Sequence, residues 1–298
     1  MATLALNRNK PAVTRRHPLI GSEIRGVDLS RPLAREELAE LEAIWMEHPM
    51  LVFPEQALTD EQQIAFARNF GDLEIHPSVA HRSSAHPEIY RVSNVDEQGD
   101  ILPSESSEWQ YMELTWLWHT DSSFREIPSK GSILHGLEIP PTGGNTLFAN
   151  MYAAYDALAD DTKARIAGLK VRHSHDAVLS RSAKLSARQD KGKYTDMPAV
   201  EQPLVRRHPV TRRRSLFLSP HTMEGVVGLP ADESRALLEE LTRHATDDRF
   251  VYRHQWQQDD VIIWDNRCTM HAVMPYDSVN HRRIMHRTTI VGDERPEA

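Results

Sequence analysis

Two short segments carry the side chains with the clearest capacity for chemistry. The first is Trp118-His119-Thr120-Asp121, and the second runs from Trp264-Asp265-Asn266 to His271, which lies 152 residues after His119. A His-x-Asp pair with one distant histidine is the ligand set of a mononuclear non-haem Fe(II) site. There, two imidazoles and one carboxylate take one face of an octahedron and leave the other face open. We therefore predict that His119, Asp121 and His271 bind ferrous iron.

The spacing of the first two ligands has a physical reason. In a β-strand, side chains at positions i and i+2 point to the same face, so His119 and Asp121 could hold one ion from one strand. A bare His-x-Asp occurs by chance in many proteins. The assignment gains support from two further residues at defined distances, Thr146 at 27 residues after His119 and Arg282 at 11 residues after His271.

Composition and charge limit the class of protein. The 298 residues are 40% hydrophobic and 26% charged, which is ordinary for a globular protein. There is no internal repeat and no linker that would divide the chain, so we expect a single domain over residues 1–298. The formal net charge of −8 argues against nucleic acid or an anionic membrane as the main partner, because both attract basic surfaces.

The single cysteine, Cys268, excludes an internal disulfide and fits a reducing cytosol. Cys268 is either a small buried hydrophobe or a neighbour of the site, since it lies between Asn266 and His271. Residues 1–16 hold no apolar run of the kind found in signal peptides, and no segment approaches the roughly 20 apolar residues of a membrane span. We expect a cytoplasmic protein that forms a homo-oligomer.

Periodicity predicts a mainly β protein with flanking helices. An amphipathic helix places Leu38, Leu41, Ile44 and Trp45 on one face. A second helix begins at Thr59, where Gln62 completes a capping box, and ends near Gly71. Thr142 to Asn145 form a tight turn. Further helices are predicted at 151–169 and 232–245, and strands at 20–29, 51–53, 89–93, 131–139, 146–148, 215–218, 250–256, 261–264 and 283–291.

Two polar segments, 76–113 and 180–202, are too long for simple connectors. Long irregular segments in a compact domain are usually functional or mobile. We interpret both as lids that close over the site and that gain protection from hydrogen exchange when ligands bind.

Four sequence motifs also resemble a known family. WHTDSSF, PPTGGNT, WDNRCTMH and HRRIMHRTT are similar to the motifs of the taurine dioxygenase and 2,4-dichlorophenoxyacetate dioxygenase family, which are Fe(II)- and 2-oxoglutarate-dependent oxygenases. The resemblance runs from GSEIRGVDL to the end of the chain. FARNFG, MYAAYDAL, FVYRHQW and VIIWDNRC point to the aryloxyalkanoate dioxygenases within it. The resemblance implies a double-stranded β-helix, a cupin-like jelly roll with iron at its mouth.

The resemblance also implies roles for individual residues. His119, Asp121 and His271 match the metal ligands, and Thr146 and Arg282 match the pair that binds the C5 carboxylate of 2-oxoglutarate. Arginine suits this carboxylate because its planar guanidinium makes two charge-assisted hydrogen bonds. The cofactors implied are Fe(II), 2-oxoglutarate as co-substrate, and O2.

The expected substrate is a small anion. Taurine dioxygenase places a sulfonate-binding arginine 15 residues after the distal histidine, and that position is His286 here, with Arg287 beside it. This departure disfavours taurine. We expect His286 and Arg287 to hold the anion, and Trp116 to contact an aromatic ring. An aryloxyalkanoate such as 2,4-dichlorophenoxyacetate would give a phenol, an oxo acid, succinate and CO2.

Two alternative functions are open at this stage. The chain could be a sulfonate or alkyl sulfate dioxygenase, or a jelly-roll binding protein without catalysis. His173, His175 and Asp176 form a second cluster of potential ligands, but no partner at a suitable spacing supports it. His221 and His254 are best interpreted as core or rim residues, and His221 could line the substrate cavity.

Overall fold

The computed structural model describes residues 10–76, 81–182 and 197–298. Its largest element is a seven-stranded sheet in the order β1-β2-β3-β13-β5-β15-β4. Neighbouring strands are antiparallel except β2 and β3, which run parallel. In this order, the strands are β1 (Ala12–Arg15), β2 (Ser22–Arg25), β3 (Met50–Phe53), β13 (Val261–Asp265), β5 (Gly131–Glu138), β15 (Ile284–Ile290) and β4 (Tyr90–Arg91).

A three-stranded antiparallel sheet faces the large one. It contains β12 (Val251–His254), β6 (Thr146–Asn150) and β14 (Thr269–Val273), in the order β12-β6-β14. Phe148 of β6 meets Trp264 of β13, with ring centroids 5.5 Å apart, and both belong to one buried apolar cluster. The two sheets therefore enclose a common apolar layer.

Two helices cover the outer face of the large sheet. These are α1 (Arg35–Glu47) and α2 (Asp60–Ala67), the second followed by the 3-10 helix η1 (Arg68–Phe70). Leu41 and Trp45 are buried as predicted, while Thr59 and Gln62 form the predicted capping box. Gly71 ends this segment with a φ of 143°, a conformation that side chains disfavour.

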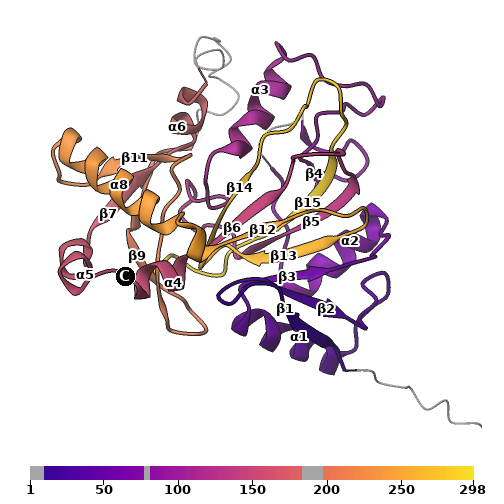
Figure 1. The fold of residues 1–298 in the computed structure, drawn as a ribbon, viewed down its shortest axis with the longest axis horizontal. Helices are drawn as coiled ribbons and strands as arrows, with labels where there is room; N and C mark the ends of the chain where they lie inside the picture. The colour runs from indigo at the N-terminus through magenta and orange to yellow at the C-terminus, as the bar shows by residue number, and fades with distance from the viewer. Residues whose placement is uncertain (1–9, 77–80, 183–196) are drawn as a thin grey trace, which may run out of the picture.

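A second lobe carries most of the remaining helices, at the left of Figure 1. It contains the strand order β11 (Met223–Val226), β7 (Lys170–His173), β8 (Val200–Pro203), and the pair β9 (Val205–Arg207) and β10 (Arg214–Leu216). Its helices are α4 (Met151–Asp156), α5 (Asp160–Ile166), α6 (His175–Ser180) and α8 (Ala231–Ala245), with the 3-10 helix η5 (Asp248–Phe250). A separate apolar cluster joins these elements to β6 and β14.

The structure confirms the mainly β class with flanking helices and corrects some local predictions. The segment 76–113 is not wholly irregular, because it contains β4 and the helix α3 (Ser107–Glu113). The predicted strand at 89–93 is shorter, at Tyr90–Arg91. Residues 183–196, most of the second expected lid, lie outside the described residues. The lid function of both segments stays a prediction.

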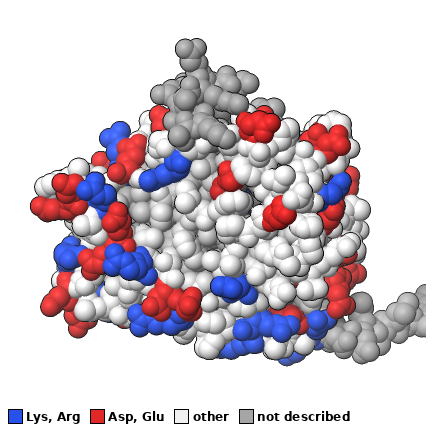
Figure 2. All heavy atoms as spheres, turned by 45° about the horizontal axis from the view of Figure 1, so that its top comes forward, with Lys and Arg blue, Asp and Glu red and all other residues white. Residues whose placement is uncertain are grey.

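The surface carries charges of both signs. On the face in Figure 2, Lys and Arg side chains alternate with Asp and Glu around the rim, and most of the hollowed centre is uncharged. This pattern differs from the continuous basic surface of a typical nucleic-acid-binding protein. Among the described residues, every helix is too short or too polar to cross a bilayer.

Candidate metal centre

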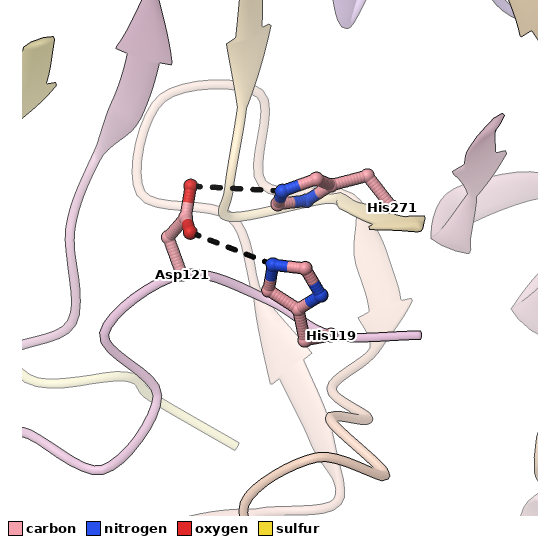
Figure 3. Close-up of side chains that lie close together, drawn as sticks. All are labelled: His119, Asp121 and His271. Carbon is pink, nitrogen blue, oxygen red and sulfur yellow. Dashed lines mark ion pairs between the residues drawn. The ribbon is translucent and has the colours of Figure 1, made fainter. Parts of the chain in front are cut away.

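The structure brings the three predicted metal ligands together in the interior (Figure 3). Nε2 of His119 lies 3.9 Å from Oδ1 of Asp121, and Nε2 of His271 lies 3.9 Å from Oδ2 of the same carboxylate. The two imidazole rings have centroids 4.1 Å apart. One ligand atom from each residue falls within 4.8 Å of the others, so a single ion fits among them.

Main-chain hydrogen bonds set this arrangement. His119 and His271 form an isolated antiparallel bridge, with N–H to O distances of 2.9 and 2.8 Å in the two directions. His271 lies on β14, but His119 does not belong to a regular strand, and Asp121 begins a turn. The prediction of one strand for His119 and Asp121 is therefore wrong in detail. A bridge followed by a turn places the two side chains together instead.

His119 presents a nitrogen lone pair to the space between the three ligands. Nδ1 of His119 lies 2.7 Å from the carbonyl oxygen of Leu117. Because a carbonyl oxygen only accepts, Nδ1 carries the hydrogen and Nε2 keeps its lone pair. The His271 ring packs against Trp264 and Phe148 at 4.8 and 6.0 Å between centroids. Burial lowers the pKa of both histidines, so both are neutral, as metal ligands must be.

Asp121 is held as an anion by its surroundings. Ser132 donates a hydrogen bond to Oδ2 at 2.7 Å, and Nη1 of Arg287 donates to Oδ1 at 2.7 Å. Burial alone would raise the pKa of Asp121. The Arg287 guanidinium and the Ser132 hydroxyl together hold that pKa well below its usual range.

A second layer of hydrogen bonds lies behind Asp121. The Asn266 amide donates to the hydroxyls of Ser129 and Ser132, at 3.0 and 3.1 Å. The Trp264 indole in turn donates to the Asn266 carbonyl oxygen at 2.9 Å. The Trp-Asp-Asn motif thus orients a metal-site carboxylate through Ser132. Ser132 itself was not identified from the sequence, because a lone serine in a strand carries no spacing signal.

Thr146 is buried beside this centre. It starts β6 opposite Val273, two residues beyond His271 on β14, and its hydroxyl accepts a 2.9 Å hydrogen bond from the Trp256 indole. The predicted turn before it is confirmed, with φ values of 74° at Gly143 and 65° at Gly144. A Cβ at Gly144 would lie 3.2 Å from the Arg283 side chain, so this glycine allows Arg283 to approach.

Arg282 does not point into the buried site, contrary to the sequence prediction. Its side chain is 40% exposed and pairs with Glu138 at 3.0 Å and with the Gly99 carbonyl oxygen at 2.7 Å. Its neighbour Arg283 is 1% exposed and donates from Nε to the Gly144 carbonyl oxygen at 3.2 Å. Nη2 of Arg283 is buried without a hydrogen-bond partner among the described residues. Arg283 therefore has unused capacity to bind a carboxylate.

β15 separates the two residues expected to hold the substrate anion. Arg287 lies inside with Asp121, and its guanidinium lies 4.7 Å from the Tyr90 ring centroid. His286 points to the opposite face, where Nδ1 is 2.6 Å from Asp60 at the start of α2. Successive residues on a strand face opposite sides, so the placement of His286 in the substrate site is wrong.

Trp116 ends the 3-10 helix η3 (Leu114–Trp116) and lies against Trp109, with ring centroids 6.5 Å apart. No strand forms at residues 114–118. His221 is nearer to the centre. Its ring lies 5.2 Å from the His119 ring, and its buried Nε2 has no hydrogen-bond partner among the described residues.

Two other groups of potential ligands were compared with the centre. His173 and His175 with Asp176 do not form a candidate metal group within the described ranges. His208, Asp265 and Cys268 do form a second one, also buried. Nε2 of His208 lies 3.0 Å from Oδ2 of Asp265, and two arginines, Arg206 and Arg267, are buried around it.

Known proteins match almost the whole chain. The family model described as "Taurine catabolism dioxygenase TauD, TfdA family" matches residues 12–289. An alpha-ketoglutarate-dependent 2,4-dichlorophenoxyacetate dioxygenase of Cupriavidus pinatubonensis is 39% identical over 280 residues, covering 93% of this chain and 96% of that protein. An (S)-phenoxypropionate/alpha-ketoglutarate-dioxygenase of Sphingobium herbicidovorans is 38% identical, covering 93% of each chain.

A solved structure supports the same assignment. The crystal structure of AAD-2 in complex with Mn(II) and N-oxalylglycine superposes with a TM-score of 0.87 at 40% identity. The match covers 97% of this chain and 100% of that one. The predicted resemblance is therefore confirmed over nearly the full length, and the chain belongs to the taurine catabolism dioxygenase TauD, TfdA family.

Proposed function

We propose that this protein is an Fe(II)- and 2-oxoglutarate-dependent dioxygenase that hydroxylates an aryloxyalkanoate. The observation that carries the proposal is the buried group of His119, Asp121 and His271 in a member of this family. Its two neutral imidazoles and one carboxylate fit a ferrous ion. We also propose that the two facing sheets are the halves of a double-stranded β-helix with this centre at its mouth.

In this proposal, His119 and His271 donate nitrogen lone pairs to iron, and Asp121 neutralises one of its charges. Ser132 and Arg287 fix the Asp121 carboxylate so that it need not reorganise when the metal arrives. When bound, ferrous iron supplies the activation of O2 that is coupled to oxidative decarboxylation of 2-oxoglutarate. The apolar layer of Phe148 and Trp264 excludes water from behind His271.

Arg283, with Thr146, is the proposed partner of the C5 carboxylate of 2-oxoglutarate. Three observations support Arg283 rather than Arg282 as this partner. Arg283 is buried, its Nη2 has no hydrogen-bond partner among the described residues, and Gly144 leaves room for its side chain in the turn just before Thr146. Arg282 is already paired with Glu138 near the surface. A buried, unpartnered guanidinium gains most from a carboxylate ligand.

The proposed substrate is an aryloxyalkanoate, as the names of the relatives suggest. Arg287 would hold its carboxylate, because this guanidinium lies at the centre and its Nε has no hydrogen-bond partner in the described part of the chain. Hydroxylation of the carbon beside the ether oxygen gives a hemiacetal, which collapses to a phenol and an oxo acid. One 2-oxoglutarate and one O2 are consumed, and succinate and CO2 are released.

Several expectations from the sequence stay predictions alongside this proposal. They are the cytoplasmic location, the homo-oligomeric state, the absence of nucleic-acid and membrane partners, the two lids, and ring contact by Trp116. Trp116 is partly buried near the segment that leads to His119, which is compatible with such a contact.

The test is a substrate panel supplied with Fe(II), 2-oxoglutarate and O2. Phenoxyacetate, both enantiomers of phenoxypropionate, taurine and alkyl sulfates are compared by succinate formation, with phenol and sulfite measured separately. We expect phenol release in step with succinate. Sulfite release without phenol would overturn the substrate class but not the iron chemistry, and no succinate from any substrate would indicate a binding protein without catalysis.

A further inference from the structure

Glu74 is a buried carboxylate that is not one of the three predicted metal ligands. It contacts the turn that contains Asp121. Its side chain is 8% exposed, and its Oε2 accepts a 2.8 Å hydrogen bond from the hydroxyl of Ser122. Arg125 lies on the other side, with Nε 3.5 Å from the same oxygen. Glu74, Ser122 and Arg125 are named here the Glu74 clasp. It joins two segments about fifty residues apart in the sequence, immediately beside a metal-site residue.

The backbone at Ser122 explains why a clasp is needed. Ser122 has a φ of 53°, in the left-handed region, and it directly follows Asp121. An L-residue meets a steric penalty in this region that glycine does not, so Ser122 would relax to a negative φ without support. Such a relaxation rotates the peptide that joins Ser122 to Asp121 and moves the carboxylate away from the two imidazoles.

The Glu74 end of the clasp is hydrogen-bonded to β15, the strand whose Arg287 side chain also contacts Asp121. The backbone N–H of Glu74 donates to the carbonyl oxygen of Thr289 on β15, at 2.8 Å. Thr289 is two residues beyond Arg287, whose guanidinium donates to Oδ1 of Asp121. Glu74 therefore ties the turn of Asp121 to the same strand that holds its carboxylate, and this geometry favours a single position for the ligand.

Burying Glu74 has a cost that a purely passive residue would avoid. Its partial pairing with Arg125 does not offset its loss of water, and burial raises the pKa of this carboxyl. An apolar residue would fill the same space at less cost if packing were the only requirement.

We propose that Glu74 is a positioning residue for metal binding, which acts by holding Ser122 in its left-handed conformation so that Asp121 faces His119 and His271. This inference rests on the proposed metal centre and goes beyond it. Glu74 is not one of the three ligands and acts through its hydrogen bond with Ser122. The role depends on hydrogen-bond acceptance by the side chain rather than on its charge.

The test is Mn(II) binding to the metal-free full-length protein, followed by electron paramagnetic resonance of the free ion. Loss of an outer-shell partner weakens metal affinity by about 10- to 100-fold, and we expect this for Glu74→Ala. Glu74→Gln still accepts the Ser122 hydrogen bond, so its affinity should stay within about threefold of wild type. Glu105→Ala is the matched control, since Glu105 accepts a 3.1 Å hydrogen bond from Ser104 at an exposed position.

A second-site change separates the clasp from a general structural role. Ser122→Gly removes the steric penalty at φ 53°, so Glu74→Ala combined with Ser122→Gly should recover the Mn(II) affinity of Ser122→Gly alone. Circular dichroism of each metal-free variant checks that it is folded. Rescue by glycine is a result that loss of packing or of charge at Glu74 cannot produce.

Four outcomes would overturn the proposal. The first is wild-type affinity in Glu74→Ala, and the second is an equal loss in Glu74→Gln, which would assign the effect to charge. The third is the absence of rescue by Ser122→Gly. The fourth is wild-type Mn(II) binding by His271→Ala, which would show that the metal centre itself is wrong and the clasp with it. The first three leave the metal centre standing.

Discussion

Two buried groups in this protein each bring three potential metal ligands together, yet the ligand atoms of the two groups differ in how they are already hydrogen-bonded. His119, Asp121 and His271 form the first group, and His208, Asp265 and Cys268 form the second. In each group the ligand atoms lie within 4.8 Å of one another, and all six residues are buried. Proximity and burial therefore do not distinguish the two groups.

The histidines differ in which nitrogen carries the hydrogen. In the second group, Nδ1 of His208 accepts hydrogen bonds from the backbone N–H groups of Val210 and Thr211, at 3.2 and 3.1 Å. Nε2 therefore carries the hydrogen and donates to Asp265. In the first group the order is reversed, because the Leu117 carbonyl oxygen fixes the hydrogen on Nδ1 of His119. Of His119 and His208, only His119 therefore has a nitrogen lone pair facing the aspartate of its group.

The carboxylates differ in what already occupies them. Nε and Nη2 of Arg267 donate to the two oxygens of Asp265, at 2.8 and 2.7 Å, which is a complete bidentate pair. Among the described residues, the Asp121 carboxylate accepts hydrogen bonds from only one nitrogen of Arg287 and from the Ser132 hydroxyl. Burial also raises the pKa of the Cys268 thiol well above its usual value, so the thiolate that a metal needs is disfavoured. The second group is a structural ion pair, and the first is a ligand set.

The largest expected effect tests this distinction directly. Mn(II) should bind with a stoichiometry of one per chain, and His271→Ala or Asp121→Asn should abolish both binding and succinate formation. Each variant removes one of only three protein ligands. Cys268→Ala should retain the stoichiometry and affinity of the wild type. Equilibrium dialysis measures both quantities, and loss of binding in Cys268→Ala would reverse the comparison.

The second prediction concerns stability. Asp265→Asn should lower the free energy of unfolding of the metal-free protein by about 3–5 kcal/mol, because it leaves Arg267 buried without its counter-charge. Asp156→Asn breaks an exposed pair with Arg213 of similar length, 2.9 Å, and should cost about 1 kcal/mol or less. Urea unfolding measures both. Equal losses in the two variants would mean that the second group does not stabilise the fold.

The third prediction extends the comparison to two adjacent arginines, one occupied and one not. Arg283→Ala should raise the apparent KM for 2-oxoglutarate by the equivalent of about 2–5 kcal/mol, because a buried carboxylate loses its cation. Arg283→Lys should recover only part, since an ammonium cannot bind both oxygens in a fork. Arg282→Ala should change KM little. A large effect in Arg282→Ala with none in Arg283→Ala would restore the original sequence assignment.

The sequence was sufficient where a local rule fixes the geometry. The capping box of Thr59 and Gln62 and the glycine turn at 142–145 both form as predicted, because each depends on a few adjacent residues. His119, Asp121 and His271 were also correctly predicted to lie together, because a His-x-Asp pair with one distant histidine matches a known metal ligand set. The positions of Ser132 and Asn266 depend on contacts between distant strands, and only the folded chain reveals them.

The sequence predictions for Arg282 and His286 were wrong because a difference of one residue decides which face of the sheet a side chain occupies. β15 has a register irregularity between Ile284 and Met285, opposite Glu138 and Gly136 on β5. A shift of one residue moves every side chain to the other face of a sheet. The two arginines also lie at the end of a loop, residues 274–283, that joins β14 to β15, and counting across it from His271 could not decide between Arg282 and Arg283. The same alternation turns His286 toward α2 and Arg287 toward Asp121.

The smallest expected effect concerns a buried histidine that belongs to neither group. His173 lies on β7 with no exposed surface, Nδ1 within 2.8 Å of the Thr222 hydroxyl and its ring stacked on Phe217. Burial lowers the pKa of His173 to about 3. A histidine in the unfolded chain titrates near pH 6.5, so between these values the unfolded state binds a proton that the folded state does not.

Stability should therefore fall on acidification, starting near pH 6.5 and continuing toward pH 3. His173 alone contributes a slope of up to about 1.4 kcal/mol per pH unit in this window. In the metal-free protein, urea unfolding at pH 7, 6 and 5 (about one unit apart, to span the titration) should show a shallower slope for His173→Gln than for wild type. His281→Gln, in the loop before β15, is the control. An unchanged slope in His173→Gln would mean that His173 is protonated in the fold, and that burial does not by itself keep this protein's histidines neutral.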